Sequence, residues 1–269
     1  MEIDYTANEM MALCAGRLVN NGDILFAGTG LSMLAATVAK RIHAHEAVVF
    51  FETGGIDPSL IELPLAVGDP RVMVGTSVNS GLADALSLLA HPKLHTVAFL
   101  GAAQIDPYGN LNSTLLGSYE KPLQRFPGSG GACDAASMAS ATIIFMQHQR
   151  RRFVEKLDYF TSPGWLTGGD SRKEAGFQRG GPIAVVTNLG LLKFDDRTRR
   201  MVLSEFYPFT TPDEIAENTG FDIDLARAVQ CSPPTKEELT TLREQIDPQR
   251  LILGPLKTAA DADSGRRKR

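Results

Sequence analysis

Short, uninterrupted apolar runs alternate with helical patterns between residues 7 and 150, and this alternation restricts the fold more than any other feature. The clearest run covers residues 48–51, where every side chain is valine or phenylalanine. Such a run is typical of a strand buried on both faces, as in a parallel sheet covered by helices. The chain has 269 residues, 43% of them apolar, which is enough for one large core. The sequence therefore predicts one α/β domain over residues 1–257, with an open, mainly parallel sheet and helices on both faces.

Capping patterns indicate where three helices begin. Thr6 with Glu9, and Thr235 with Glu238, have the spacing of a capping box. Thr211 precedes a proline and two acidic residues, which favours a third helix start. We expect further helices at 82–89 and 132–139, and one that carries Met33, Leu34, Val38 and Ile42. We expect strands at 24–27, 48–51, 72–74, 96–100, 111–115, 142–146, 153–160, 183–187, 191–194 and 201–206.

Charge and composition exclude several classes of protein. The net charge is −4 and the dense basic runs are confined to residues 150–152 and 266–269, so no nucleic acid partner is expected. We interpret the arginines at 150–152 as a solvated junction between two apolar stretches. The acidic N-terminus lacks a signal-peptide pattern and no apolar stretch is long enough to span a membrane. Three cysteines without a pairing pattern favour reduced thiols. We therefore expect a cytoplasmic protein without membrane contact, ending in a disordered tail at 258–269.

Glu52 follows the apolar run at 48–51 directly, at the expected carboxyl end of a strand. Ligands collect at this edge of open parallel sheets. One interpretation is structural, with the carboxylate capping the turn at 53–55. The other is chemical, because a carboxylate held beside an activated acyl group in a dry pocket can act as a nucleophile or a general base. The residue types alone leave both interpretations open.

Two glycine-rich segments are candidate contacts for an anionic oxygen. Gly28 and Gly30 follow the first expected strand and precede a helix, where backbone amides can face an anion. Gly128, Gly130 and Gly131 precede another expected helix. Three glycines in four positions cost backbone entropy, which favours a special conformation or a close backbone approach. An oxyanion site and a purely structural loop both fit this second segment.

The remaining patterns provide little evidence for a bound cofactor or metal. Gln104 and Asn110 flank a turn at 106–109 that has ordinary type I turn chemistry. The five histidines show no ligand spacing beside cysteines or carboxylates, so no metal site is expected. A nucleotide-binding Walker loop and a Gly-x-Ser-x-Gly nucleophile motif are both absent from the sequence, and the Gly28 turn lacks the third glycine of a dinucleotide fingerprint.

Four motifs occur in order along the chain: Glu52-Thr53-Gly54, GAAQIDPYGN at 101–110, GSGGA at 128–132 and TSPGW at 161–165. In this order and spacing they resemble the second (beta) subunit of family I coenzyme A (CoA) transferases of the glutaconate and 3-oxoadipate type. The resemblance runs from residue 6 to about residue 248. Thr53 stands where many relatives have serine or asparagine. The fold implied is the open α/β fold of CoA-transferase and NagB/RpiA-like proteins.

The resemblance also implies a mechanism and a partner. It makes Glu52 the nucleophile that attacks acyl-CoA, in a ping-pong reaction through a glutamyl anhydride and an enzyme-CoA thioester. It makes the five glycines named above, with Gln104 and Asn110, candidate contacts for the oxyanion and CoA. An alpha subunit supplies the other wall of the active site, in a heterodimer or a larger hetero-oligomer. CoA is a substrate in this reaction, and no cofactor is implied.

Two other functions fit the same fold. Relatives in this superfamily hydrolyse or decarboxylate CoA thioesters, typically where the glutamate is replaced, so the presence of Glu52 favours transfer. A sensor or scaffold subunit without catalytic activity is the second alternative. The acid that accepts CoA is not specified by these motifs. Arg125, beside the glycine-rich segment at 128–131, is a candidate contact for the distal carboxylate of a dicarboxylic substrate.

Overall fold

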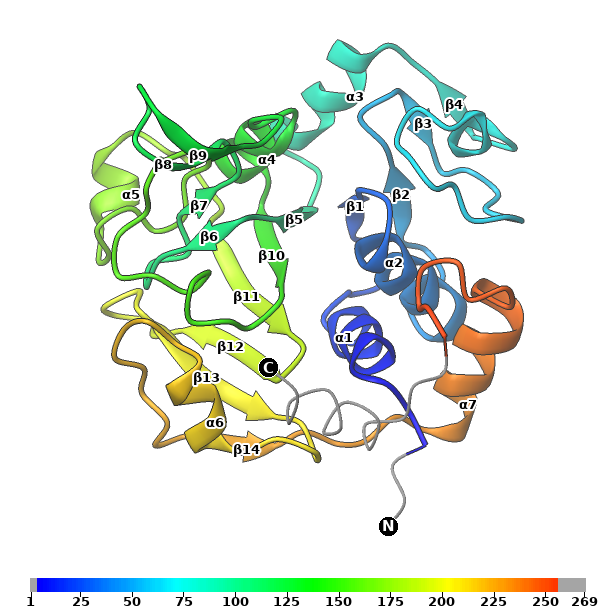
Figure 1. The fold of residues 1–269 in the computed structure, drawn as a ribbon. Coiled ribbons are helices and arrows are strands. Elements are labelled where there is room, and N and C mark those ends of the chain that lie inside the picture. The colour runs from blue at the N-terminus through cyan, green and yellow to red at the C-terminus, as the bar shows by residue number, and fades with distance from the viewer. Residues whose placement is uncertain (1–3, 256–269) are drawn as a thin grey trace.

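The computed structural model describes residues 4–255, and a ten-stranded sheet forms its centre (Figure 1). The predicted mainly parallel α/β sheet is confirmed, because the four pairs that join the five strands from β2 to β11 are all parallel. The strands β12, β3 and β4 extend this centre by antiparallel pairing. In sheet order the strands are β14 (Val229–Gln230), β13 (Met201–Phe206), β12 (Gly190–Phe194), β11 (Pro182–Thr187), β10 (Ala141–Met146), β5 (Thr96–Gly101), β1 (Ile24–Phe26), β2 (Val48–Phe50), β3 (Gly55–Ile56) and β4 (Val78–Asn79).

Helices cover both faces of the sheet, which explains why its central strands are apolar throughout. Successive residues on a strand face opposite sides, and Val49 and Phe50 accordingly belong to two different buried clusters. The first cluster contains side chains from α1 (Ala7–Gly16), α2 (Leu31–Ile42) and the helical turn Thr241–Ile246 that follows α7 (Lys236–Thr240). The second contains side chains from α3 (Leu82–Ser87), the short helix Leu88–Ala90, α4 (Ala132–Met138) and α6 (Pro212–Glu217).

The connection between the strands changes direction next to β1. The chain passes from β1 through α2 to β2 on one side, and β5 then adds to the other side of β1. In open parallel sheets, such a reversal leaves a crevice outside the carboxyl ends of the two strands that flank it. The loops after β1, β2 and β5 all lie at this edge, so it is the place at which the fold can gather residues for a site.

Two small hairpins extend beyond the carboxyl end of β5. One consists of β6 (Gln104–Ile105) and β7 (Leu111–Asn112), and the other of β8 (Leu115–Gly117) and β9 (Pro122–Arg125). Figure 1 shows both hairpins to the left of β5, with β8 and β9 beside α4. They place the segment between residues 102 and 128 over one end of the sheet. The helical turn α5 (Ser171–Glu174) follows later in the chain.

The capping predictions are confirmed and two strand predictions are wrong. A third predicted strand, at 111–115, is divided between β7 and β8, which belong to different hairpins. Thr6 and Thr235 form capping boxes, and Thr211 accepts a hydrogen bond from the Glu214 amide at the start of α6. The segment predicted as a strand at 72–74 lies instead at a short 3-10 helix, Pro70–Met73, which Asp69 caps. The segment at 153–160 makes only isolated bridges at Phe153 and Val154.

The predicted domain limit at residue 257 and the predicted tail at 258–269 lie outside the described residues. Within residues 4–255, no helix is both long and apolar enough to cross a membrane. The three cysteines are free thiols.

Candidate active site

Glu52 occupies a tight turn between β2 and β3, at the carboxyl edge of the sheet. The Gly54 amide donates to the Phe51 carbonyl at 3.0 Å, and the Phe51 amide donates to the Gly55 carbonyl at 3.0 Å. Glu52 and Thr53 are thus the two central residues of a hydrogen-bonded turn, where side chains project away from the strands. Glu52 is half-buried.

Gly54 is required by the backbone conformation of this turn. Its φ angle is +106°, a region that other residues rarely adopt. A Cβ atom placed on Gly54 would lie 1.9 Å from the carbonyl oxygen of Ser80, far inside contact distance. The close approach follows from pairing, since the Ser80 amide donates to the Gly54 carbonyl at 2.9 Å. The turn that carries Glu52 is therefore fastened to the segment after β4.

The Glu52 carboxylate lies against the start of α4. A Cβ atom placed on Gly131 would be 2.9 Å from Oε2 of Glu52, 3.3 Å from Leu86 and 3.4 Å from Phe26. Gly131 is buried, so the glycine leaves the space that the carboxylate uses. The structure thus brings Glu52 together with Gly131, two residues that lie far apart in the chain.

The Glu52 carboxylate has no hydrogen-bonding or ion-pair partner among the described residues. Among the residues that the structure describes, it accepts no hydrogen bond and forms no ion pair. The structural interpretation, in which this side chain caps the turn at 53–55, requires a hydrogen bond to a turn amide. Since no such bond forms, both carboxylate oxygens remain available to an incoming molecule.

The other glycines of the two segments adopt conformations that favour glycine. The φ angles are +92° at Gly30, +100° at Gly128 and +49° at Gly130. A Cβ atom on any of these three would meet no atom within 4 Å, so their open sides face free space. A Cβ atom on Gly28 would meet only the Ser32 hydroxyl, at 3.8 Å. Within residues 4–255 the Gly130 and Gly131 amides donate to no protein acceptor, and Gly131 lies against the Glu52 carboxylate.

A cavity of about 700 Å³ lies beyond the end of β5. It is bordered by residues 102–104 after β5, by the β8–β9 hairpin, by Gly128, and by Arg151, Arg152 and Asp158. Gly128 lines this cavity and Gly131 contacts Glu52, so the glycine-rich segment connects the two. Three peptide units separate Gly128 from Gly131, so the Cα atoms of these two glycines lie within about 11 Å of each other.

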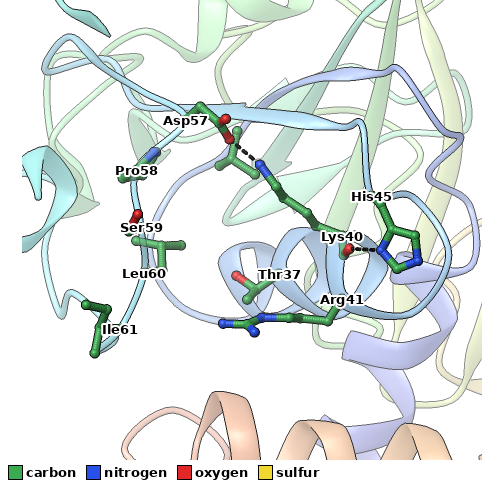
Figure 2. A pocket seen from close by; sticks show the side chains of 10 residues that line it. Thr37, Lys40, Arg41, His45, Asp57, Pro58, Ser59, Leu60 and Ile61 are labelled. Carbon is green, nitrogen blue, oxygen red and sulfur yellow. Dashed lines mark hydrogen bonds and ion pairs between the residues drawn. The ribbon is translucent and has the colours of Figure 1, made fainter. Parts of the chain in front are cut away.

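A second cavity, of about 380 Å³, contains none of the predicted site residues. It lies between α2 and the loop at 57–61, and Figure 2 shows Lys40 bridged to Asp57 across it. Arg41 also lines this cavity and makes no ion pair within the described part of the chain. Because neither Glu52 nor any of the motif glycines borders it, we do not assign it to the active site.

Gln104 lines the first cavity but its amide group is already engaged. Its Oε1 accepts from Nδ2 of Asn112 at 2.7 Å and from the Asp158 amide at 3.1 Å, while its Nε2 donates to Oδ2 of Asp158 at 3.1 Å. Gln104 therefore shapes the wall, and a direct polar contact with CoA would require these bonds to break.

Asn110 is a structural residue, which corrects its interpretation as a CoA contact. Only 2% of it is exposed. Its Nδ2 donates to Asp106 and to the Leu166 carbonyl, each at 2.7 Å, and its Oδ1 accepts from the Gly164 amide at 2.8 Å. These bonds fasten the turn at 106–109 to the segment at 164–166, and they saturate the side chain.

Comparison with known proteins assigns this arrangement to a family. A family model described as Coenzyme A transferase matches residues 8–218. The chain belongs to the coenzyme A transferase family. It is 43% identical over 258 residues to the second subunit of glutaconate CoA-transferase of Acidaminococcus fermentans, covering 91% of this chain and 94% of that protein. It is 35% identical over 240 residues to the second subunit of 3-oxoadipate CoA-transferase of Pseudomonas knackmussii. That alignment covers 89% of this chain and 92% of the relative.

The structural comparison agrees with this family assignment. The crystal structure of glutaconate coenzyme A-transferase from Acidaminococcus fermentans superimposes with a TM-score of 0.90 at 42% identity, covering 95% of this chain and 100% of that one. The decarboxylase AibA/AibB shares the fold, with a TM-score of 0.78 at 24% identity. This CoA-transferase chain thus resembles the beta subunits of two-subunit enzymes over most of its length.

In this CoA-transferase subunit, Arg125 is not among the residues that line the cavity, and its role as a substrate contact stays a prediction. It is the last residue of β9, and its neighbours Leu123, Gln124 and Phe126 line the cavity. Its guanidinium lies over the Tyr119 ring, 5.3 Å from the centroid, and the side chain is exposed.

The arginines that do line the cavity are Arg151 and Arg152, which belong to the run that the sequence pattern indicates as a solvated junction. A signal for them exists in the sequence. They follow the end of β10 by a few residues, and the carboxyl end of a parallel strand is where site residues gather.

Two groups with strongly shifted pKa values are structural. Burial raises the pKa of Glu9, but hydrogen bonds from Arg243, Arg250 and a backbone amide outweigh it and lower this pKa to about 2. Burial lowers the pKa of His148 to about 3, and its two ring nitrogens lie within hydrogen-bond distance of two threonine hydroxyls. Neither residue lines either cavity. Within residues 4–255, no three His, Cys, Asp or Glu side chains are grouped so as to hold a metal ion.

Proposed function

We propose that this chain is the nucleophile-bearing subunit of a two-subunit CoA-transferase, with Glu52 as the residue that becomes acylated. The observation that supports this most directly is the placement of the Glu52 carboxylate. It stands at the carboxyl edge of the sheet, against Gly131, and no hydrogen bond or ion pair within the described residues engages it. A carboxylate in that state is free to attack an acyl group delivered along the edge.

The proposed reaction proceeds by two exchanges at Glu52. Its carboxylate attacks the thioester carbonyl of the donor acyl-CoA, the carbon–sulfur bond breaks, and a mixed anhydride and CoA thiolate form. The thiolate then attacks the glutamyl carbonyl, which releases the donor acid as its carboxylate and leaves CoA joined to Glu52 as a thioester. The acceptor carboxylate repeats both steps in reverse and restores free Glu52. Water must stay out of the site, because hydrolysis of either intermediate would lose the thioester energy.

The backbone amides of Gly130 and Gly131 are the donors placed to stabilise this chemistry. Each attack creates a tetrahedral oxyanion, and preorganised amide donors lower the energy of such a charge. Both amides lack a protein acceptor within the described residues, and the Gly131 position touches Glu52. The open conformations at Gly128 and Gly130 leave room for the thioester to approach the backbone.

The substrate class proposed is a CoA ester of a dicarboxylic acid. Glutaconate and 3-oxoadipate, named in the two relatives, are both dicarboxylates. CoA enters as a substrate, and the proposal includes no other cofactor. Three free thiols agree with a reducing compartment such as the cytoplasm.

The function can be tested by a transfer assay on the assembled enzyme. The chain is co-expressed with its alpha-type partner, and acetyl-CoA is supplied as donor with glutaconate or 3-oxoadipate as acceptor. We expect CoA transfer with ping-pong kinetics, in which double-reciprocal plots at several donor concentrations are parallel. Release of free CoA without formation of a new thioester would instead support the hydrolase alternative.

We further propose that the alpha subunit docks on an apolar rim beside the Glu52 turn. Five exposed large hydrophobic side chains lie within one segment of 22 residues in the part of Figure 1 around β3, β4 and α3. Exposed apolar side chains gathered in this way mark interaction surfaces. The segment is joined to the turn by the Ser80–Gly54 hydrogen bond, so a partner seated there would also border Glu52. The rim comprises Ile61, Leu65, Val74, Val78 and Leu82.

Substituting aspartate in this rim should weaken assembly of the two subunits. We expect Ile61→Asp and Leu82→Asp to lower the affinity of the chain for its alpha partner by about 10-fold or more, since each would place a charge in an apolar contact. Size-exclusion chromatography and calorimetric titration of the two subunits measure this. The matched control is Val229→Asp on β14, which has a 60% exposed side chain at the opposite edge of the sheet. Equal effects from all three variants would contradict the assignment of the rim.

A further inference from the structure

Two arginines in the cavity beyond β5 carry charge that no carboxylate neutralises. Nε of Arg151 and Nε of Arg152 both donate to Oε1 of Gln149, at 3.0 and 3.3 Å. Nη1 of Arg152 also donates to the Ala102 carbonyl at 3.4 Å. Neither arginine forms an ion pair within residues 4–255. The neutral Gln149 amide and the Ala102 carbonyl therefore orient the two guanidinium groups without neutralising their positive charge, so an anionic ligand can pair with them.

The acidic residue of the cavity is engaged elsewhere. Oδ2 of Asp158 accepts from Nε2 of Gln104 at 3.1 Å and from the Gly117 amide at 3.0 Å. With two arginines and one aspartate among its lining residues, the cavity has a formal charge of +1. The cavity is thus positively charged although the chain as a whole has a net charge of −4. An anionic group is the ligand that such a cavity favours.

The rest of the wall fits a short carbon chain. Leu116, Leu123 and Phe126 line the same cavity. Gly128 borders it, and Gly131, three residues on, contacts Glu52. A molecule whose carbonyl carbon is at Glu52 and which follows the glycine-rich segment from Gly131 to Gly128 would enter the cavity, with its chain against the apolar side chains.

We infer that Arg151 and Arg152 bind the distal carboxylate of a dicarboxylic substrate. The planar guanidinium matches a carboxylate with two parallel hydrogen bonds, which gives both affinity and orientation. Binding the far end of the acid would fix the near end for reaction at Glu52. The inference rests on the proposed function and adds to it the residues that select two-ended acids. It gives to this pair the role that the sequence favoured for Arg125.

The test compares diacids with monoacids on the assembled enzyme. Glutaconate and 3-oxoadipate are paired with but-2-enoate and 3-oxopentanoate, which lack the distal carboxylate. We expect Arg152→Ala to lower kcat/KM for the diacids by about 100-fold, with a further loss in the Arg151→Ala, Arg152→Ala double variant. The values for the monoacids should stay roughly unchanged. Arg152→Lys should recover only part of the loss, because lysine keeps the positive charge but cannot make two parallel hydrogen bonds to a carboxylate.

Arg150→Ala is the matched control, because Arg150 is exposed and does not line the cavity. Among the described residues its side chain donates only to the Glu217 carbonyl. It should leave the diacid preference unchanged. Equal losses on diacids and monoacids would overturn the inference. A loss that disappears when dephospho-CoA replaces CoA would also overturn it, since the arginines would then contact a CoA phosphate.

A binding measurement separates this inference from the proposed function. Calorimetric titration of glutaconate or 3-oxoadipate into the assembled enzyme requires no turnover. Weaker diacid binding in Arg152→Ala, with thermal unfolding unchanged, supports the carboxylate site even if the reaction is not transfer. Unchanged diacid binding in that variant overturns the site even if transfer is observed.

Discussion

Replacing Glu52 with glutamine should lower CoA transfer by at least about 1,000-fold while the chain stays folded and assembled with its partner. Loss of an attacking group that forms a covalent intermediate has effects of this size or larger. The amide has nearly the same shape but cannot attack a thioester. Since the carboxylate makes no hydrogen bond or ion pair within the described residues, its replacement removes no stabilising contact. Transfer rates and thermal unfolding of the assembled enzyme measure the two halves of this prediction.

Trapping the intermediate identifies the residue directly. The enzyme is incubated with acyl-CoA without an acceptor and then treated with borohydride, which reduces a glutamyl thioester to an alcohol. Peptide mass analysis should find the reduced side chain at position 52 in the native enzyme and nowhere in Glu52→Gln. The control Glu237→Gln replaces an exposed carboxylate in the first turn of α7 and should retain full activity. Turnover by the native enzyme with an unmodified Glu52 would show that the covalent route is wrong.

The sequence predicted the centre of the fold well, because strands buried on both faces have a distinct composition. The runs that became β2, β5 and β10 contain few polar residues. In the sheet order β5 and β10 are the two central strands, and β2 lies inside the parallel part of the sheet. At 72–74, short apolar length suggested a strand. Pro70 and the Asp69 side chain, which caps the turn, instead start a 3-10 helix there. Local capping chemistry outweighed apolar character in this segment, which lies away from the sheet centre.

Position along a strand indicates which residues are candidates for the site, whereas contacts with distant segments decide what each candidate can do. Glu52 is a candidate because a charged residue at the end of an apolar strand lies at the edge where ligands bind, and the family resemblance, rather than residue type, favours its role as the nucleophile. Asn110 was misassigned because its partners are the Gly164 amide and the Leu166 carbonyl, more than fifty residues away. Arg125 is adjacent to residues that line the cavity, but its guanidinium lies over the Tyr119 ring, a contact that residue type alone does not indicate. Hydrogen-bond saturation and side-chain contacts are three-dimensional properties that residue type does not reveal.

Gly54→Ala should destabilise the protein strongly, because two costs combine at this position. A φ of +106° is strained for alanine, and a Cβ atom 1.9 Å from the Ser80 carbonyl oxygen cannot be accommodated without moving backbone. Together these effects amount to roughly 2–5 kcal/mol. Thermal unfolding should shift down by roughly 10 °C for a domain of this size. Gly68→Ala, where a Cβ atom meets nothing within 4 Å, is the matched control and should unfold near the native temperature.

Gly131→Ala provides the opposite combination of effects and so separates stability from catalysis. Its backbone, at φ −75° and ψ 0°, suits alanine, and the nearest atom to the added methyl group is the free end of Glu52, at 2.9 Å. That carboxylate can swing aside at little cost in stability, but a nucleophile displaced by about 1 Å loses on the order of 100-fold in rate. We therefore expect nearly native unfolding with strongly reduced transfer. Full activity in Gly131→Ala would mean that the reacting carboxylate does not lie against α4, and the geometry proposed for the oxyanion donors would then be wrong as well.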